Sequence, residues 1–509
     1  MAMKRIITGF FMLLMILQTQ TGCKKFLNVK PLDRLAGNSF FQTKQDVENN
    51  LWDIYGLLRD KLGSCPYLAW AGDLRSGMMG PSAEVTNRAY RHMVPMNDLN
   101  NVVNATSSQY WWAGTFNVGA FSTWATFYQV VQESNILYYQ LGLGKINGLT
   151  NEDVKRYQAE AVFLRCMAYF LMIRMYGDVP YYTKPYEQDP LPRMDMVQVA
   201  NNCLADLDKV KDDLPWTYTD PAFLGVRACR GAAMALMMNL DMWNAGFDKS
   251  NAQKYEQQAA ELGGEIVASG AYELLPIQNF HEIFKGRTKE SLFEIVQNAN
   301  YGETLAYETF PDMVLHYPYK RPAYNHQYSF CYFRSSFLLK LYPAGQADQR
   351  IQYWFDQDML SDNGNFQFLK FTNIFAISDN QDVNPDNDII IFRYAGAILL
   401  RAEALADLGQ DAEAIKMLNI VRARAAATPY SGSGGQDLWN AIFAERAKEL
   451  MGEGHYYFDL VRTGMVMNPS WDYYPLTQAQ FTARAWTWPL SPTVQSNNPN
   501  IQLNTYWLK

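Results

Sequence analysis

LLRAEALADLGQDAEAIKMLNIVRARA, residues 399–425, decides the fold class of this chain. Apolar residues recur at helical spacing on both sides of Leu408-Gly409, and a glycine at such a point is typical of a helix end. Ala414 follows Gly409 at the small-residue spacing with which tetratricopeptide helices pack closely. The stretch therefore predicts a helical hairpin of the tetratricopeptide type.

Helical periodicity extends outward from this hairpin along most of the chain. Residues 159–176 place Val162, Cys166 and Tyr169 on one helical face, and the glycine and proline of 177–180 end the pattern. Strand-like alternation is short and local, as at 292–296. We expect a mostly α-helical protein with a framework of degenerate tetratricopeptide hairpins over about 121–268 and 388–462, and loop-rich regions over about 64–112 and 270–387. The further helical patterns cover 44–62, 121–141, 194–213, 227–245, 252–268, 391–408, 411–426 and 436–462.

Composition limits the class of partner. The chain has 509 residues, 48% of them hydrophobic and 19% charged, which indicates a folded protein. Its formal net charge is −7, so it lacks the basic footprint that nucleic acid requires. Aromatic residues make up 14%, a surplus that carbohydrate or peptide binding could use.

The N-terminus has the pattern of a lipoprotein signal. Lys4 and Arg5 precede an apolar stretch over 6–17, which is too short to span a bilayer. Gly22-Cys23 then resembles the lipobox at which bacterial lipoproteins are cleaved and acylated, although Gln20 stands where the lipobox prefers leucine. We therefore expect a signal peptide over 1–22 and a mature single domain over 23–509, with palmitate-type acyl chains on Cys23 that hold the protein to a membrane.

The cysteines and acidic turns predict no metal or cofactor. Without Cys23, an odd number of scattered cysteines remains, and none has the spacing of a zinc site or a disulfide framework. Asp382 to Asp388 alternate like calcium-loop ligands, yet the glycine and glutamate of such a loop are missing, so we interpret them as a turn.

Five blocks resemble one protein family in its own order. They are CKKFLNVKP (23–31), AEAVFLRCMAYFLMIRMYGDVPYY (159–182), the segment 388–425, ERAKELMGEGHYYFDLVRTG (445–464) and WPLSPTVQSNNPNIQLNTYW (488–507). On these blocks the chain is similar to the SusD/RagB family of Bacteroidetes outer-membrane lipoproteins over nearly its whole mature length. The resemblance implies a tetratricopeptide-containing fold without catalytic activity, attached over a SusC-like TonB-dependent transporter barrel. It also implies capture of oligosaccharide, or in some members peptide.

One carboxylate series has two interpretations. Glu445, Glu449 and Glu453 lie four residues apart, and paired carboxylates are what a glycosidase needs. The same spacing suits an ion-pair network with nearby Arg446 and Arg462. We favour the network, so no catalytic residue is predicted.

Two segments in which apolar residues follow no sustained helical or strand periodicity are the candidate ligand site. Residues 64–112 and 298–334 combine tryptophans and tyrosines with many loop-forming and polar residues. Flat rings can stack on sugar C–H faces while Asp, Asn and Arg bind hydroxyls, although rings can also pin a loop to the protein body. We predict that six residues converge on one exposed face: Trp70, Asp73, Arg75, Tyr301, Tyr319 and Tyr324.

The sequence thus favours a glycan-capturing import lipoprotein of the outer membrane, facing outward. A peptide-capturing, RagB-like lipoprotein is the alternative, and an enzyme or a pure scaffold is less favoured. Lys24 and Lys25 stand where surface lipoproteins of such bacteria tend to carry acidic residues, which argues against the predicted orientation on the outer face of the membrane.

Overall fold

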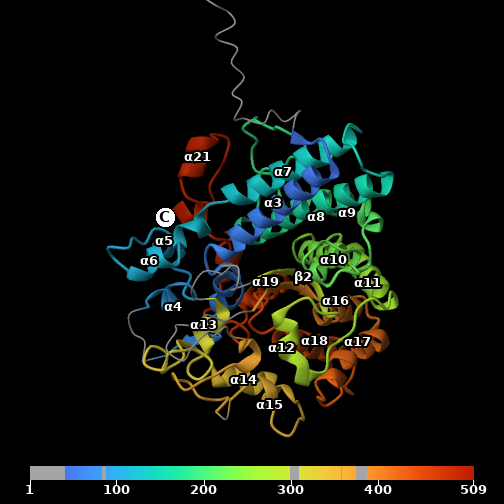
Figure 1. Cartoon of the computed structure of the whole chain (residues 1–509). Helices are drawn as coiled ribbons and strands as arrows, with labels where there is room; N and C mark the ends of the chain where they lie inside the picture. Colours follow the sequence, from blue (N-terminus) through green and yellow to red (C-terminus); the bar gives the residue numbers. More distant parts are fainter. Residues whose placement is uncertain (1–39, 83–87, 298–308, 357, 374–386, 509) are drawn as a thin grey trace, which may run out of the picture.

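The computed structural model describes residues 40–82, 88–297, 309–356, 358–373 and 387–508, and Figure 1 shows their helical arrangement. The predicted signal peptide and Cys23 lie outside these residues. Within them no helix is long and apolar enough to cross a membrane. The mostly helical prediction is confirmed.

Long helices form the framework and pair in sequence order. α7 with α8, α10 with α11 and α16 with α17 are adjacent partners, in keeping with tetratricopeptide-like hairpins. Gly409 has a φ of 70° at the turn between α16 and α17, as the sequence of this hairpin predicts. The long helices are α3 (Lys44–Gly63), α7 (Ala125–Gly142), α8 (Asn151–Tyr176), α9 (Met196–Asp208), α10 (Arg230–Phe247), α11 (Ala252–Ala268), α16 (Tyr394–Asp407), α17 (Asp411–Arg424), α18 (Gln436–Glu449) and α19 (Tyr456–Thr463).

Short elements lie mainly in the regions predicted to be loop-rich, with a few near the C-terminus. The strands make two antiparallel pairs, β1 with β3 and β2 with β4, so each pair joins segments far apart in sequence. The short elements are β1 (Met79–Pro81), α4 (Tyr90–Met93), α5 (Leu99–Val103), α6 (Trp111–Thr115), α12 (Phe280–Lys285), β2 (Ser291–Ile295), α13 (Phe310–Val314), β3 (Cys331–Phe333), α14 (Ser335–Leu341), α15 (Arg350–Trp354), β4 (Ile389–Arg393), α20 (Gln478–Thr482) and α21 (Thr493–Asn497).

Local sequence explains where helices begin and end. Thr150 opens α8 with a capping box, since its side chain accepts from the Asp153 amide and Asp153 reciprocates. One prediction was wrong: residues 436–462 form two helices, not one. Gly452 and Gly454 have φ values of 83° and 79°, which no right-handed helix contains, so the chain turns between α18 and α19.

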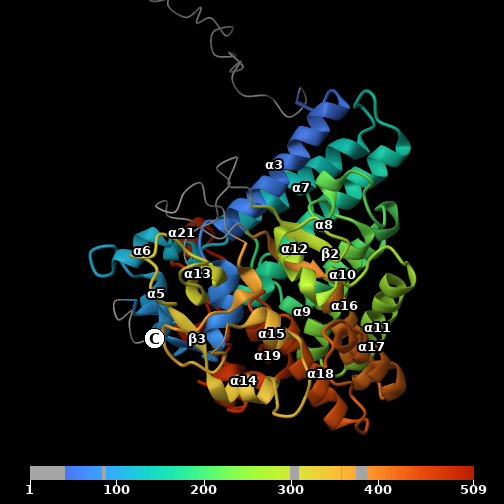
Figure 2. The same ribbon diagram turned by 60° about the horizontal axis from the view of Figure 1, so that its bottom comes forward.

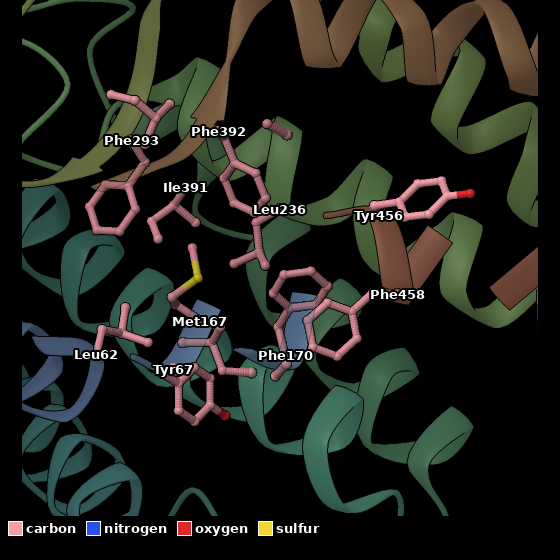
Figure 3. Packing of buried hydrophobic residues seen from close by; sticks show 14 of the residues in the cluster. Leu62, Tyr67, Met167, Phe170, Leu236, Phe293, Ile391, Phe392, Tyr456 and Phe458 are labelled. Atoms are coloured by element: carbon pink, nitrogen blue, oxygen red, sulfur yellow. The ribbon is translucent and has the colours of Figure 1, made fainter. Parts of the chain in front are cut away.

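Helix α8 is the centre of the core. Every residue from Ala159 to Tyr176 is buried, which explains its nearly continuous apolar sequence. Figure 3 shows Met167 and Phe170 of α8 among side chains of α10, α19 and the β2–β4 pair. The Phe163 and Phe293 rings meet edge to face at 4.9 Å. The core therefore joins the N-terminal helices to the C-terminal half.

The carboxylate series is an ion-pair network, as we favoured. Glu449 is fully buried and lies 2.8 Å from nitrogens of both Arg350 and Arg393. Its pKa is held far below the usual range, because the surrounding arginines outweigh the effect of burial. Glu445 binds Arg350, and Glu453 binds Arg393. These cations come from 350–393, much earlier in the chain than the predicted Arg446 and Arg462.

Arg446 and Arg462 belong to a neighbouring network. Arg446 approaches Asp459 at 3.1 Å, and Arg462 pairs with both Asp459 and Glu403. The two networks tie the α16–α17 hairpin to α18 and α19. In the described part of the chain, all the cysteines, Cys65, Cys166, Cys203, Cys229 and Cys331, are free and buried.

Candidate ligand-binding face

The two segments predicted to form the ligand site meet in the structure. β1 pairs with β3, and Met79 lies opposite Phe333. Next to this pair the Ser82 amide donates to the Phe330 carbonyl at 2.9 Å, and Arg91 donates to the same carbonyl at 3.0 Å. The two segments are therefore neighbours in the structure. Figures 1 and 2 show α5, α6 and α13 on the side of the molecule away from α17, and Figure 1 shows α4 on that side as well.

Trp70 does not face solvent. Its side chain is 0% exposed, and its ring stacks on Tyr90 at 4.3 Å and on Phe121 at 5.6 Å between ring centroids. Phe116 approaches from the edge. Both indole faces are covered by protein rings, so Trp70 offers no platform to a ligand and belongs to the core.

Asp73 and Arg75 are buried as well and hold the turn to the C-terminal half. Asp73 accepts from the Gly454 amide at 2.8 Å, and burial raises its pKa to about 7. Arg75 donates at 2.7 Å to the Ala485 carbonyl and lies 4.7 Å above the Tyr457 ring. The exposure expected of all three side chains is contradicted, and we assign this turn a structural role.

The three predicted tyrosines differ. Tyr301 lies outside the described residues. Tyr319 is half-buried and packs against the core, whereas Tyr324 is 70% exposed. Whether either one contacts a ligand stays a prediction.

Other rings of the same segments are exposed. We call five residues the aromatic face: Tyr110, Trp111, Tyr317, Tyr324 and Tyr328. Trp111 is 44% exposed. All five lie within the two segments defined from sequence, but four were not among the six candidate contacts. Their exposure depends on tertiary packing, which no sequence pattern reports.

Arg88 connects the two parts of the aromatic face. Its guanidinium carbon lies 4.8 Å from the Trp111 ring centroid and 3.9 Å from that of Phe330. Beyond Phe330, the Tyr317 amide donates to the His326 carbonyl at 2.8 Å, which closes the tyrosine-bearing loop. Exposed Asn325 and Gln327 lie among these tyrosines. The face thus combines flat rings, neutral hydrogen-bonding groups and the guanidinium of Arg88.

The surface has few features of a metal or catalytic centre. No cluster of three histidine, cysteine, aspartate or glutamate side chains suited to a metal ion occurs among the residues with assigned positions. Glu445 and Glu449 are fully buried and bound by arginines, while the exposed rings lie on other elements. The arrangement is that of a helical-repeat protein with an aromatic, polar surface.

Comparison with known proteins defines the particular family. The chain belongs to the SusD family. A model described as "SusD family" matches residues 342–507, and one described as "Starch-binding associating with outer membrane" matches residues 39–240. The family prediction from sequence is thereby confirmed.

Individual relatives cover nearly the whole chain. A SusD homolog from Bacteroides thetaiotaomicron is 36% identical in sequence and has a TM-score of 0.84, with 92% of this chain and 99% of that one aligned. A SusD-like protein of Formosa agariphila is 24% identical over 97% of both chains. A laminarin-binding SusD-like protein shares the fold at 20% identity and a TM-score of 0.67, with 91% of this chain and all of that one aligned.

Proposed function

We propose that this protein captures an oligosaccharide on the aromatic face and passes it, uncleaved, to a SusC-like TonB-dependent transporter. The observation that carries the proposal is the exposed ring set, Trp111 with Tyr317, Tyr324 and Tyr328, beside neutral polar side chains. Large exposed aromatic side chains mark ligand or partner surfaces, and sugar rings stack on them. The starch-binding description of the matching family model and the laminarin-binding relative support a saccharide as ligand.

The state of the three candidate carboxylates supports capture without hydrolysis. A glycosidase needs two carboxyl groups beside the scissile bond, one of them able to give up a proton. Glu445, Glu449 and Glu453 are buried, and each is bound by arginine or lysine. Incubation of the pure protein with its bound oligosaccharide should leave the saccharide intact; release of shorter products would contradict this role.

The aromatic face gives a direct test of the ligand. In a binding screen against oligosaccharides and peptides, we expect saccharides to bind, and Trp111→Ala to weaken binding by about 1–3 kcal/mol, the scale of an aromatic anchor. Isothermal titration calorimetry measures the change. Tyr139→Ala is the matched control, because Tyr139 is 45% exposed on α7, outside the two segments that form this face. Binding of peptides alone, or equal losses in both variants, would contradict the proposal.

We also propose that residues 1–22 are removed and that the mature single domain, 23–509, is anchored by lipid on Cys23 at the outer face of the outer membrane. Association with the outer membrane agrees with the family description. Cys23→Ala should move the protein from the membrane to the soluble fraction, because the acyl chains supply the anchoring energy. Protease treatment of intact cells should digest the wild type; a protected protein would argue against the outward orientation.

A further inference from the structure

A cleft lies beneath the C-terminal tail, apart from the aromatic face. One lobe, of about 280 Å³, lies between α5 and the tail, and its neighbour, of about 480 Å³, lies between the tail and the loop after α8. Arg193, Leu503 and Asn504 line both lobes, and we call the two lobes together the tail cleft. Its size is that of a small-ligand site.

The walls of the tail cleft are fixed by hydrogen bonds. Arg193 donates at 2.6 Å to the Asp178 carbonyl and at 2.9 Å to the Gln502 carbonyl, which joins the loop after α8 to the tail. On the other side, Asn100 of α5 donates to the Trp507 carbonyl at 2.9 Å. A cleft whose walls are held before binding loses little conformational entropy when a ligand enters.

One wall has a fixed ring. The Trp507 indole nitrogen donates to the Thr487 hydroxyl at 3.0 Å, and Tyr506 meets its ring edge to face at 4.7 Å. The indole is only partly buried and lines the lobe beside α5 together with Pro489 and Leu490. A ring held in this way can stack on the C–H face of a sugar.

Amide groups share this lobe with the ring. Asn100, Asn101 and Asn104, on α5 and its C-terminal end, line the same lobe. Their side-chain nitrogens donate to protein oxygens, while their side-chain oxygens accept no hydrogen bond from the residues that the structure describes. Three such oxygens are acceptors for hydroxyl donors.

The charges around the cleft favour a neutral ligand. Arg193 is the charged residue that lines the lobe beside α5, and its guanidinium donates to the backbone carbonyls of Tyr176, Asp178 and Gln502. In the other lobe Arg484 pairs with Asp178 at 2.6 Å. A ring, apolar prolines and neutral acceptors together match a molecule that has hydroxyl groups and C–H faces but no charge.

We propose that the tail cleft is a second saccharide site, which takes a neutral hexose unit between Trp507 and the α5 asparagines. It rests on the proposed function, because it assigns the same ligand class to a second place. α5 lies beside α6, the helix that begins at Trp111, in Figures 1 and 2. A protein with two separate sites holds a long or branched saccharide more firmly than one site does.

The test uses the full mature chain and four sugars: glucose, galactose, mannose and N-acetylglucosamine. Crystals soaked in each sugar should show at least one of them in the tail cleft, and tryptophan fluorescence should report the same sugar in solution. The double variant Asn101→Ala with Asn104→Ala should weaken that binding by about tenfold, the scale of two lost neutral hydrogen bonds. Both asparagines are exposed, so the fold should be retained.

Asn497→Ala is the matched control, since Asn497 is an exposed asparagine on α21 that does not line the cleft. The affinity of this variant for the sugar should equal that of the wild type. No sugar in the cleft in any soak, or an unchanged affinity of the double variant, would overturn the proposal.

Trp111→Ala separates the two sites. If only that variant loses saccharide binding, the tail cleft is refuted and the proposed function stands; if only the double variant does, the aromatic face is refuted.

Discussion

Glu449→Gln is expected to lower the free energy of unfolding by about 3–5 kcal/mol, the cost of removing one partner from a buried charge network. Glutamine preserves the side-chain volume but replaces one oxygen by an amide group that cannot accept from a guanidinium. Arg350 and Arg393 would each lose a charged partner at 2.8 Å while remaining buried. Arg424, which also contacts Glu449, would lose a third contact. Urea denaturation followed by circular dichroism measures the change.

Glu413→Gln is the matched control for this variant. Glu413 and Lys416 form an exposed pair on α17 at 3.6 Å, and exposed pairs contribute little to stability. The control should stay within about 0.5 kcal/mol of the wild type. Folded Glu449→Gln protein should keep wild-type saccharide affinity. If its stability equalled that of the control, the network would not stabilise the packing of α18 against its neighbours. If affinity fell while the fold was retained, a role at the ligand site would be indicated.

The sequence predicted the framework because the framework has local signals. The helical stretch over 159–176 is nearly continuously apolar because all of these residues are buried, and Gly177, with a φ of 71°, ends it at the predicted position. The hairpin over 399–425 was predicted from a different local signal, its helical periodicity and the glycine at the turn, Gly409, which has a φ of 70°. The four-residue spacing of Glu445 and Glu449 correctly indicated a shared network, but their partner Arg350 lies about a hundred residues away, where no spacing rule reaches.

The ligand site could be located by segment but not by residue. Trp70 and Trp111 have similar loop surroundings in sequence, yet one is buried and the other exposed. Their difference depends on distant segments: a side chain on Gly72 would place its Cβ 2.1 Å from the Gly454 carbonyl oxygen, so the turn around Trp70 is pressed against the C-terminal half. Gly72 beside Asp73 was a signal of close backbone approach, but it did not identify the partner.

Trp70→Ala is expected to destabilise the protein by about 3–5 kcal/mol, as truncation of a buried tryptophan does in other cores. The substitution would remove the ring that is stacked on Tyr90 and Phe121 and leave a cavity. The turn that holds Asp73 and Arg75 would then lose the support of this ring. Trp111→Ala, by contrast, removes a 44% exposed ring and should change stability by less than about 1 kcal/mol.

The pair of tryptophan variants separates a structural role from a binding role. Thermal and urea unfolding should show the large loss for Trp70→Ala alone, and calorimetric titration of folded protein should show the affinity loss for Trp111→Ala alone. The reverse outcome, a stable Trp70→Ala protein with weakened saccharide binding, would restore Trp70 as a ligand platform. Since Trp70 is 0% exposed, that result would require the ring to leave the core when the ligand binds.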